Sequence, residues 1–527
     1  MTTETLDLGQ SLDFQPKFEK DGEMIVVGKT MLNPVLPELT NEFLTWKKEF
    51  WVKMLKEKGI KNIVAPMVDQ SELAFRVLLR RHGAHLCYTP MIHAHLFVTN
   101  FTYRRQALST IPSDRPLIVQ FCANDPDIFL DACRLVEGYC DGVDLNLGCP
   151  QIVAKRGQYG SFLQEKPDLI RKMIEKVHKH CRLPLSVKIR CLETVERTLE
   201  YAKLCEDAGA CMLTIHGRRR DQRGVETGVA DWEKIRAVVE HLSIPVIANG
   251  NIQMPGDVEK CIEKTGAVAV MSAEGILSNP LLFEGIIRPG FDVAKEYLEL
   301  AERYKASTAT IRAHVFRMCH YSFLKYPDLR ERNSYVISLD EFKSVVNDLE
   351  KRCREENTID PYDVKLVDLA LPFPEMVASI PYYLCKPYVR ATQSLEPVEK
   401  DFRIQRKVEM AKIQNETGLS FRQIRKRERR RIDMKKEFSR KCAFPVCKRC
   451  NQPAGVGCEN EMCRKCCRFV CVRNGKLCKA HRFTIETLRD RRDAYAEQMG
   501  INKEDLKASD ALGEEQHADT AIEVGES

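Results

Sequence analysis

The stretch GVDLNLGCPQ, residues 142–151, joins a strand-like run to a turn that carries a cysteine. Apolar residues alternate with Asp144 and Asn146, and Gly148 and Pro150 then favour a turn. Cys149 is therefore expected at the end of a strand, with its sulfur displayed. Free cysteine is commonly a small core residue, so the surrounding sequence must decide its role.

Working outward from this stretch, the same order of strand, loop and amphipathic helix recurs. The apolar runs are 62–67, 86–91, 116–121, 142–147, 184–190, 211–217, 244–250 and 267–273. Continuous apolar strands separated by helices predict a parallel sheet that is buried on both faces. Eight repeats in about 220 residues predict an α/β fold, a (β/α)8 TIM barrel. A doubly wound open sheet is the alternative.

Polar residues follow the apolar runs at the point where each run stops. They are Met67–Asp69, Gln120, Asn146, Cys149, Lys188, Arg190, His216, Arg218, Asn249, Asn251, Ser272 and Glu274. In a barrel the C-terminal strand ends meet at one face, where active sites are built. The alignment predicts that Cys149 faces the mouth of the barrel.

The last two strand ends carry ANGNI and AEG, whose small residues let backbone N–H groups approach an anion. Ordinary turn chemistry explains Asn-Gly equally well. Lys188 would be buried without a negative partner, whereas His216 taken alone is more often a core histidine. Beside a phosphate site, the two suit an electron-rich ring with a phosphate tail, and flavin mononucleotide (FMN) fits.

Six segments now carry a family resemblance: VAPMVDQSELAFR, VQFCANDP, DGVDLNLGCPQIVAKRGQYGSFL, VKIR, LTIHGR and IPVIANGNI. In this order, over roughly 60–290, they resemble tRNA-dihydrouridine synthases, and most of all the eukaryotic (16/17) group. The resemblance implies an FMN barrel, a helical domain that holds tRNA, and NAD(P)H as reductant. It implies flavin contacts from Pro66, Met67, Val68, Gln120, Lys188, His216, Asn249, Gly250, Asn251, Ala273 and Glu274.

The resemblance also matches Cys149 to the proton donor of the family. Reducing the 5,6 double bond of uracil needs a hydride at C6 and a proton at C5. A thiol with an ordinary pKa near 8.5 is protonated at neutral pH and acidic enough to give up that proton. We expect Asn146, Arg190 and Arg218 to bind substrate, and the target base to leave its stack.

Two departures from the family pattern stand out. Arg219-Arg220 follows HGR where relatives often have a threonine first, and AEG replaces an arginine-containing GRG. The second departure makes phosphate binding depend more on backbone N–H groups, which weakens the assignment of Glu274.

The composition of the 527 residues predicts a soluble protein of several domains. No apolar run approaches the roughly 18–20 residues of a membrane span, so no membrane partner is expected. The first ten residues hold two acids and no base, which argues against a targeting leader. We expect an intracellular protein, in nucleus and cytoplasm, with reduced thiols.

The second half of the chain changes in composition along its length. Residues 422–441 hold eleven Lys/Arg against three acids, a density that favours RNA phosphates and also fits a nuclear signal. The expected parts are an N-terminal extension (1–58, with a possible amphipathic helix), the FMN barrel (59–291), a helical tRNA-binding domain (292–398), a basic helical linker (399–441), a Cys-rich zinc module (442–485) and an acidic, disordered tail (486–527).

Nine of the 22 cysteines crowd into 442–478. A dense cluster in a reducing compartment indicates metal binding, and pairs two residues apart suit tetrahedral zinc. Eight ligands would make two sites, with one of Cys466 and Cys467 spare, loosely like an interleaved MYND or HIT module. An iron–sulfur cluster is the minor rival, and RNA or protein partners are both open. The candidate ligands are Cys447, Cys450, Cys458, Cys463, Cys466, Cys467, Cys471, Cys478 and His481.

Two other functions fit part of this pattern. A flavin oxidoreductase that acts on a free pyrimidine, like dihydroorotate dehydrogenase, explains the strand ends but leaves the basic segment and the zinc module without a role. A non-catalytic RNA-binding scaffold explains those parts but not the flavin-type mouth.

Overall fold

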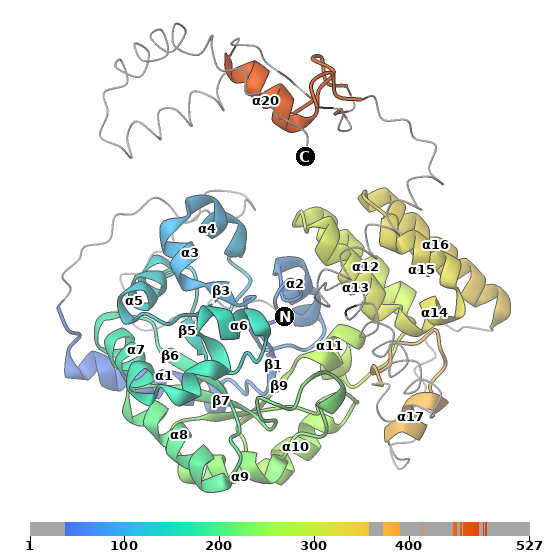
Figure 1. The fold of residues 1–527 in the computed structure, drawn as a ribbon. Coiled ribbons are helices and arrows are strands. Elements are labelled where there is room, and N and C mark those ends of the chain that lie inside the picture. Colours follow the sequence, from blue (N-terminus) through green and yellow to red (C-terminus); the bar gives the residue numbers. More distant parts are fainter. Residues whose placement is uncertain are drawn as a thin grey trace, which may run out of the picture. The chain divides into compact units, whose positions relative to one another are not determined.

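The structure is a computed structural model, and it describes residues 37–357, 373–389, 414, 446–450, 454–455, 457–473, 478 and 480–481. The chain divides into two compact units, Met1–Leu395 and Glu396–Ser527. Figure 1 shows the first unit as a barrel with a group of helices packed beside it. In the described residues no helix is long and apolar enough to cross a membrane.

Eight parallel strands close into a barrel (Figure 1). They are β1 (Asn62–Val64), β2 (Leu86–Tyr88), β4 (Leu117–Cys122), β5 (Gly142–Asn146), β6 (Leu185–Arg190), β7 (Met212–His216), β8 (Val246–Asn249) and β9 (Ala269–Ser272). Each pairs with the next, and β9 returns to β1 through Ile63 opposite Met271. The barrel and the eight predicted strands are confirmed, and the open sheet is excluded. Among the strands of the described residues, the sequence missed β3 (Ile92–His93), a short addition beside β4.

Helices connect the strands and cover the outside of the barrel (Figure 1). They are α2 (Leu73–Arg81), α3 (Ala94–Thr99), α4 (Phe101–Ala107), α5 (Pro126–Leu135), α6 (Ile152–Gly157), α7 (Pro167–His180), α8 (Val195–Asp207), α9 (Trp232–His241), α10 (Asp257–Thr265) and α11 (Glu274–Ser278). Local signals set several ends: Asp125, Thr194 and Asp231 cap α5, α8 and α9 with their side-chain oxygens. Gly266 ends α10 at a φ of 70°.

Helix α1 (Asn41–Glu57) confirms the amphipathic helix expected before the barrel. Its Lys47 is fully buried and donates to the carbonyls of His178 (2.8 Å) and Cys181 (2.7 Å). Trp51 packs against Gly142, where an added Cβ would lie 2.8 Å from the indole ring. Helix α1 therefore covers the N-terminal end of β5, opposite the mouth, and contributes to the barrel core.

The helical part comprises α12 (Gly290–Arg303), α13 (Thr308–Met318), α14 (His320–Lys325), α15 (Pro327–Tyr335), α16 (Leu339–Glu356) and α17 (Phe373–Ser379). One continuous apolar core joins it to the barrel. Glu72 at the start of α2 accepts from Tyr297 (2.8 Å) and pairs with His314 (3.0 Å). These buried contacts tie the helices to the barrel next to the loop after β1.

Apart from residue 414, the described residues of the second unit lie around its cysteines and include the helix α20 (Arg464–Arg473). The predicted basic linker 399–441, apart from residue 414, and the predicted tail 486–527 lie outside the described residues. Their proposed roles stay predictions.

Candidate active site

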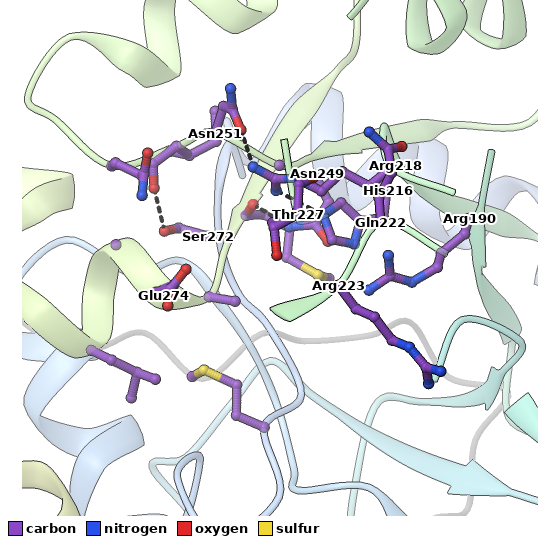
Figure 2. A pocket seen from close by; sticks show the side chains of 18 of the residues that line it. Arg190, His216, Arg218, Gln222, Arg223, Thr227, Asn249, Asn251, Ser272 and Glu274 are labelled. Carbon is purple, nitrogen blue, oxygen red and sulfur yellow. Dashed lines mark hydrogen bonds between the residues drawn. The ribbon is translucent and has the colours of Figure 1, made fainter. Parts of the chain in front are cut away.

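A pocket of about 340 Å3 opens at the C-terminal ends of the barrel strands (Figure 2). Its volume falls within the range of ordinary ligand sites. It brings together nine of the predicted residues: Met67, Arg190, His216, Arg218, Asn249, Gly250, Asn251, Ala273 and Glu274. They come from five different strand ends, as the barrel geometry requires.

Arg218 organises the side of the pocket formed by β7 and β8. Its guanidinium hydrogen-bonds His216 Nε2 (3.2 Å), donates to Asn251 Oδ1, and donates to the carbonyl of Gly228 (3.0 Å). Gly250 has a φ of 117°, and an added Cβ would lie 2.7 Å from Ala230. Glycine is therefore needed for backbone and side chains to close together here.

Lys188 and His216 determine the charge at the inner wall of the pocket. Lys188 Nζ donates to Asn249 Oδ1 (2.8 Å), and Asn249 in turn donates to the carbonyl of Met271 (2.8 Å). Burial, and then the nearby Arg190, lower the pKa of Lys188 to about 8. Burial, and then the positive charges of Arg190, Lys188 and Arg218, hold the pKa of His216 well below its usual range. Its imidazole is therefore neutral.

Cys149 lies three residues after the end of β5 and is half-buried. Its backbone N–H donates to Asn146 Oδ1 (2.9 Å), and its carbonyl accepts from the N–H (3.1 Å) and hydroxyl (3.0 Å) of Ser161. Gly160 has a φ of 66°, and an added Cβ would lie 2.8 Å from the Cys149 carbonyl. The backbone of Cys149 is thus held from two sides, with the residue only partly covered.

Two arginines connect this turn to the pocket that they line. Arg190 donates from Nε to the carbonyl of Gly148 (2.8 Å) and from Nη1 to that of Arg219 (2.9 Å). Arg223 donates to the carbonyl of Pro150. Carbonyls on both sides of Cys149 are therefore fixed by side chains of the pocket wall (Figure 2 shows both arginines).

Polar side chains in the interior of the barrel also lead to the Cys149 turn. Asp144 accepts from Gln120 (2.8 Å), and Gln120 accepts from Asn146 (2.8 Å). Asp144 is fully buried. Burial raises its pKa to about 6, although hydrogen bonds from Ser186 and Gln120 oppose that shift. At neutral pH the carboxylate is ionised.

Not every predicted residue lines the pocket. Pro66, Val68, Gln120, Asn146, Cys149 and Lys188 are outside its lining, and Val68 is exposed. Lys188 reaches the lining through its hydrogen bond to Asn249, and the turn that holds Cys149 is linked to the lining by the hydrogen bond from Arg190 to Gly148. The predicted residues therefore form two adjoining groups, the pocket and the Cys149 turn, rather than one ring.

Sequence reasoning missed several residues that line the pocket, among them Gln222, Arg223, Thr227 and Arg317. The unusual run after His216 was noted, but the run ends at Arg223, and its contact with Pro150 has no sequence signal. Arg317 comes from α13 and lies 3.9 Å from Glu274. A helix that packs beside the barrel contributes to the mouth only through tertiary structure.

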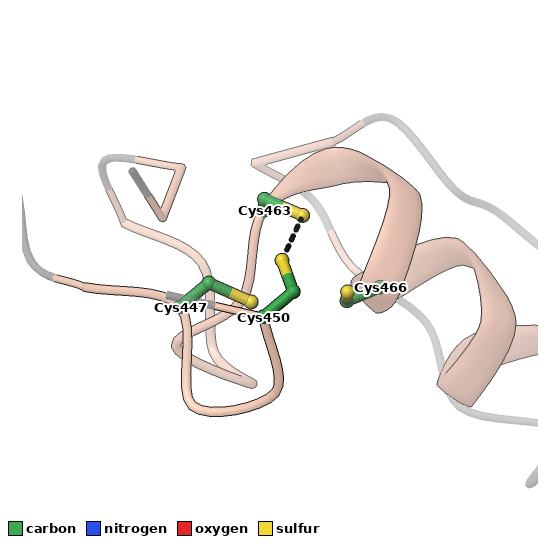
Figure 3. A group of neighbouring side chains, drawn as sticks. All are labelled: Cys447, Cys450, Cys463 and Cys466. Atoms are coloured by element: carbon green, nitrogen blue, oxygen red, sulfur yellow. Dashed lines mark hydrogen bonds between the residues drawn. The ribbon is translucent and has the colours of Figure 1, made fainter. Parts of the chain in front are cut away.

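The described part of the Cys-rich segment contains two groups that can hold a metal ion. They are Cys447, Cys450, Cys463 and Cys466 (Figure 3), and Cys458, Cys467, Cys478 and His481. In each group the ligand atoms lie within 4.8 Å of one another. The two sets alternate along the chain, as the sequence predicted. The expectation that Cys466 or Cys467 is spare differs from this arrangement, because each of them belongs to a group and Cys471, among the described candidate ligands, belongs to neither.

The family model of dihydrouridine synthase (Dus) matches residues 63–357, more than half of the chain, and the chain belongs to this family. A Mus musculus protein named "tRNA-dihydrouridine(16/17) synthase [NAD(P)(+)]-like" is 42% identical over 444 residues, which cover 83% of this chain and 90% of that protein. The Saccharomyces cerevisiae tRNA-dihydrouridine(16/17) synthase is 42% identical over 361 residues (63% and 84%). A Homo sapiens tRNA-dihydrouridine(20a/20b) synthase-like protein is 38% identical over 242 residues (45% and 75%).

Proposed function

We propose that this protein reduces uridine in tRNA to dihydrouridine, with FMN as cofactor and NAD(P)H as reductant. One observation carries the proposal: a half-buried cysteine follows β5 beside a cationic pocket at the barrel mouth, in a chain of the dihydrouridine synthase family. The (16/17) relatives align over more of this chain than the (20a/20b) relative. Positions 16 and 17 of tRNA are therefore the proposed targets.

The residues of the pocket fit FMN. Arg218 and the small residues around Gly250 form a cationic side of the pocket that suits a phosphate, and an added Cβ at Gly250 would collide with Ala230. Lys188 and the neutral His216 supply a cation and an uncharged ring for the flavin ring system. In its reduced form, FMN held by these residues would supply the hydride needed at C6 of uracil.

The residues of this chain supply the proton and the orientation. The Cys149 thiol donates its proton to C5 as negative charge develops there, and the sulfur becomes a thiolate. The fixed carbonyls of residues 148–150 hold its position. Asn146, Arg190 and Arg218 are the proposed substrate contacts, because their polar groups lie next to this turn or in the pocket beside it.

The second unit is proposed as a zinc module. Two groups of thiolates, one with His481, have the ligand types of structural tetrahedral zinc sites. Together with the basic segment before it, the module would add contacts to tRNA, and a protein partner is also open. Nucleus and cytoplasm are the proposed locations, since RKRERRR (425–431) also resembles a nuclear signal.

The test is reduction of an unmodified tRNA transcript by the purified full-length protein with FMN and NADPH or NADH. The product gains two hydrogens per uridine, which mass spectrometry detects. Cys149→Ala should keep bound flavin and lose turnover by about 100-fold or more. Cys122→Ala is the matched control, because Cys122 is a buried thiol in the same side-chain cluster. It should retain activity within about threefold.

Two results would contradict the proposal. Parental turnover by Cys149→Ala would remove the cysteine from its role as proton donor. Salt-independent reduction of free uridine, with tRNA inert, would favour a pyrimidine oxidoreductase.

A further inference from the structure

A row of three polar side chains runs through the barrel interior to the Cys149 turn. Asp144 Oδ2 accepts from Gln120 Nε2 (2.8 Å), and Gln120 Oε1 accepts from Asn146 Nδ2 (2.8 Å). Asn146 Oδ1 then accepts from the backbone N–H groups of Cys149 (2.9 Å) and Gly148 (3.2 Å). Asp144 and Gln120 are fully buried, and Asn146 is 8% exposed.

The groups at the two ends of the row have opposite hydrogen-bonding requirements. An ionised carboxylate only accepts hydrogen bonds, and a backbone N–H only donates. Gln120 must therefore turn its nitrogen to Asp144, which leaves its oxygen for Asn146. Asn146 must then offer its nitrogen to Gln120 and its oxygen to Cys149. Of the possible orientations of the two amides, only this one gives every contact a donor and an acceptor.

We infer that Asp144 is a positioning residue: its carboxylate at one end of the row, with the backbone N–H groups of Gly148 and Cys149 at the other, sets the orientation of the Gln120 and Asn146 amides. Each amide nitrogen uses one N–H within the row and keeps a second one. In this orientation, Gln120 and Asn146 each offer an N–H donor to a ligand at the mouth of the barrel. The acceptors would be carbonyl oxygens or unprotonated ring nitrogens of flavin and uracil. This last step rests on the proposed function, whereas the order of the amides does not.

The other groups that face Asp144 do not set the orientation of the Gln120 amide. Ser186 on β6 donates to Asp144 Oδ1 (2.6 Å), but a hydroxyl rotates and can either donate or accept, so it does not set the order. Lys188, also on β6, is the nearby cation and favours the ionised form of Asp144. Tyr88 on β2 faces the same carboxylate, and burial followed by that charge raises the pKa of its phenol.

Exchanging the two ends of the row tests the inference. In Asn146→Asp, carboxylates flank Gln120, and neither orientation of its amide satisfies both. In the double variant Asp144→Asn with Asn146→Asp the net charge is restored. Gln120 can then turn its nitrogen to the new carboxylate at position 146 and its oxygen to the new amide at position 144, so every contact of Gln120 is satisfied in reverse order.

The measurements on the full-length holoenzyme are the midpoint of thermal unfolding and the dissociation of FMN on dilution, followed by its fluorescence. Asn146→Asp should lower the midpoint by about 5 °C or more, and the double variant should recover most of that loss. The double variant should still bind FMN about tenfold more weakly than the parent, because the spare N–H of Gln120 has moved. Ser186→Ala, the matched control, should leave FMN binding within about twofold.

A double variant no more stable than Asn146→Asp, or one that does not fold, would overturn the order of the amides. Parental FMN affinity in the double variant would overturn its role toward the ligand. If the parent itself binds no FMN, the proposed function fails, and the midpoints still judge the order of the amides.

Discussion

Replacing Asp144 by asparagine should stabilise the protein at neutral pH. The folded state raises the pKa of this carboxyl from an ordinary 3.8 to about 6, first because of burial. Between these values the folded state binds more protons than the unfolded state, so this group makes the free energy of unfolding fall as pH rises. Above pH 6 the cost levels off at about 3 kcal/mol, from roughly two pKa units at 1.36 kcal/mol each.

Asparagine has nearly the same shape, accepts from Gln120 through its oxygen, and carries no charge. Its stabilising effect should reach about 3 kcal/mol at pH 7.5 and fall to roughly half of that at pH 5. The assay is urea unfolding of parent and variant across this pH range, where other titrations cancel in the difference. A variant that is less stable at every pH, or a difference that does not change with pH, would show that folding does not raise the pKa of Asp144.

Three further predictions concern the pocket, the turn and the Cys-rich segment. Since the pKa of Lys188 is about 8, the FMN affinity of the parent should weaken as pH rises above that value. Lys188→Met should bind FMN more weakly at neutral pH, and its affinity should depend less on pH. The same pH dependence in parent and variant would contradict this. Gly160→Ala should lower turnover about tenfold or more with flavin retained, because its Cβ displaces the Cys149 carbonyl; parental turnover would contradict the close packing. Elemental analysis should find two zinc ions per chain, one in Cys467→Ser and two in Cys471→Ser; equal loss in both variants would contradict the two groups.

The barrel could be predicted because most of the strands are largely apolar runs that are followed by polar residues. Parallel strands buried on both faces leave that pattern in sequence, and the closing contact of β9 with β1 follows from their number. The short strand β3 could not be predicted, because two residues beside β4 carry no periodicity. Helix α1 was recognised from its pattern, but its place beneath the barrel depends on Lys47 and Trp51 reaching partners far along the chain.

The sequence predicted the residues of the active site more completely than the hydrogen bonds between them. Strand ends indicated Lys188, His216 and Asn249, which the structure places at one wall. The hydrogen bonds from Arg190 and Arg223 to the carbonyls around Cys149 depend on side-chain conformations that no local pattern records. The assignment of cysteines to metal groups had the same limit, because spacing alone gives Cys467 and Cys471 similar standing as ligands.

Mass mapping of tRNA from cells that lack this protein is the decisive test of whether it makes dihydrouridine in tRNA. We predict that dihydrouridine at positions 16 and 17 is lost, returns with the parental gene, and does not return with Cys149→Ala. Unchanged dihydrouridine at both positions would contradict the proposed targets. An unchanged pattern at every tRNA position would contradict the proposed activity.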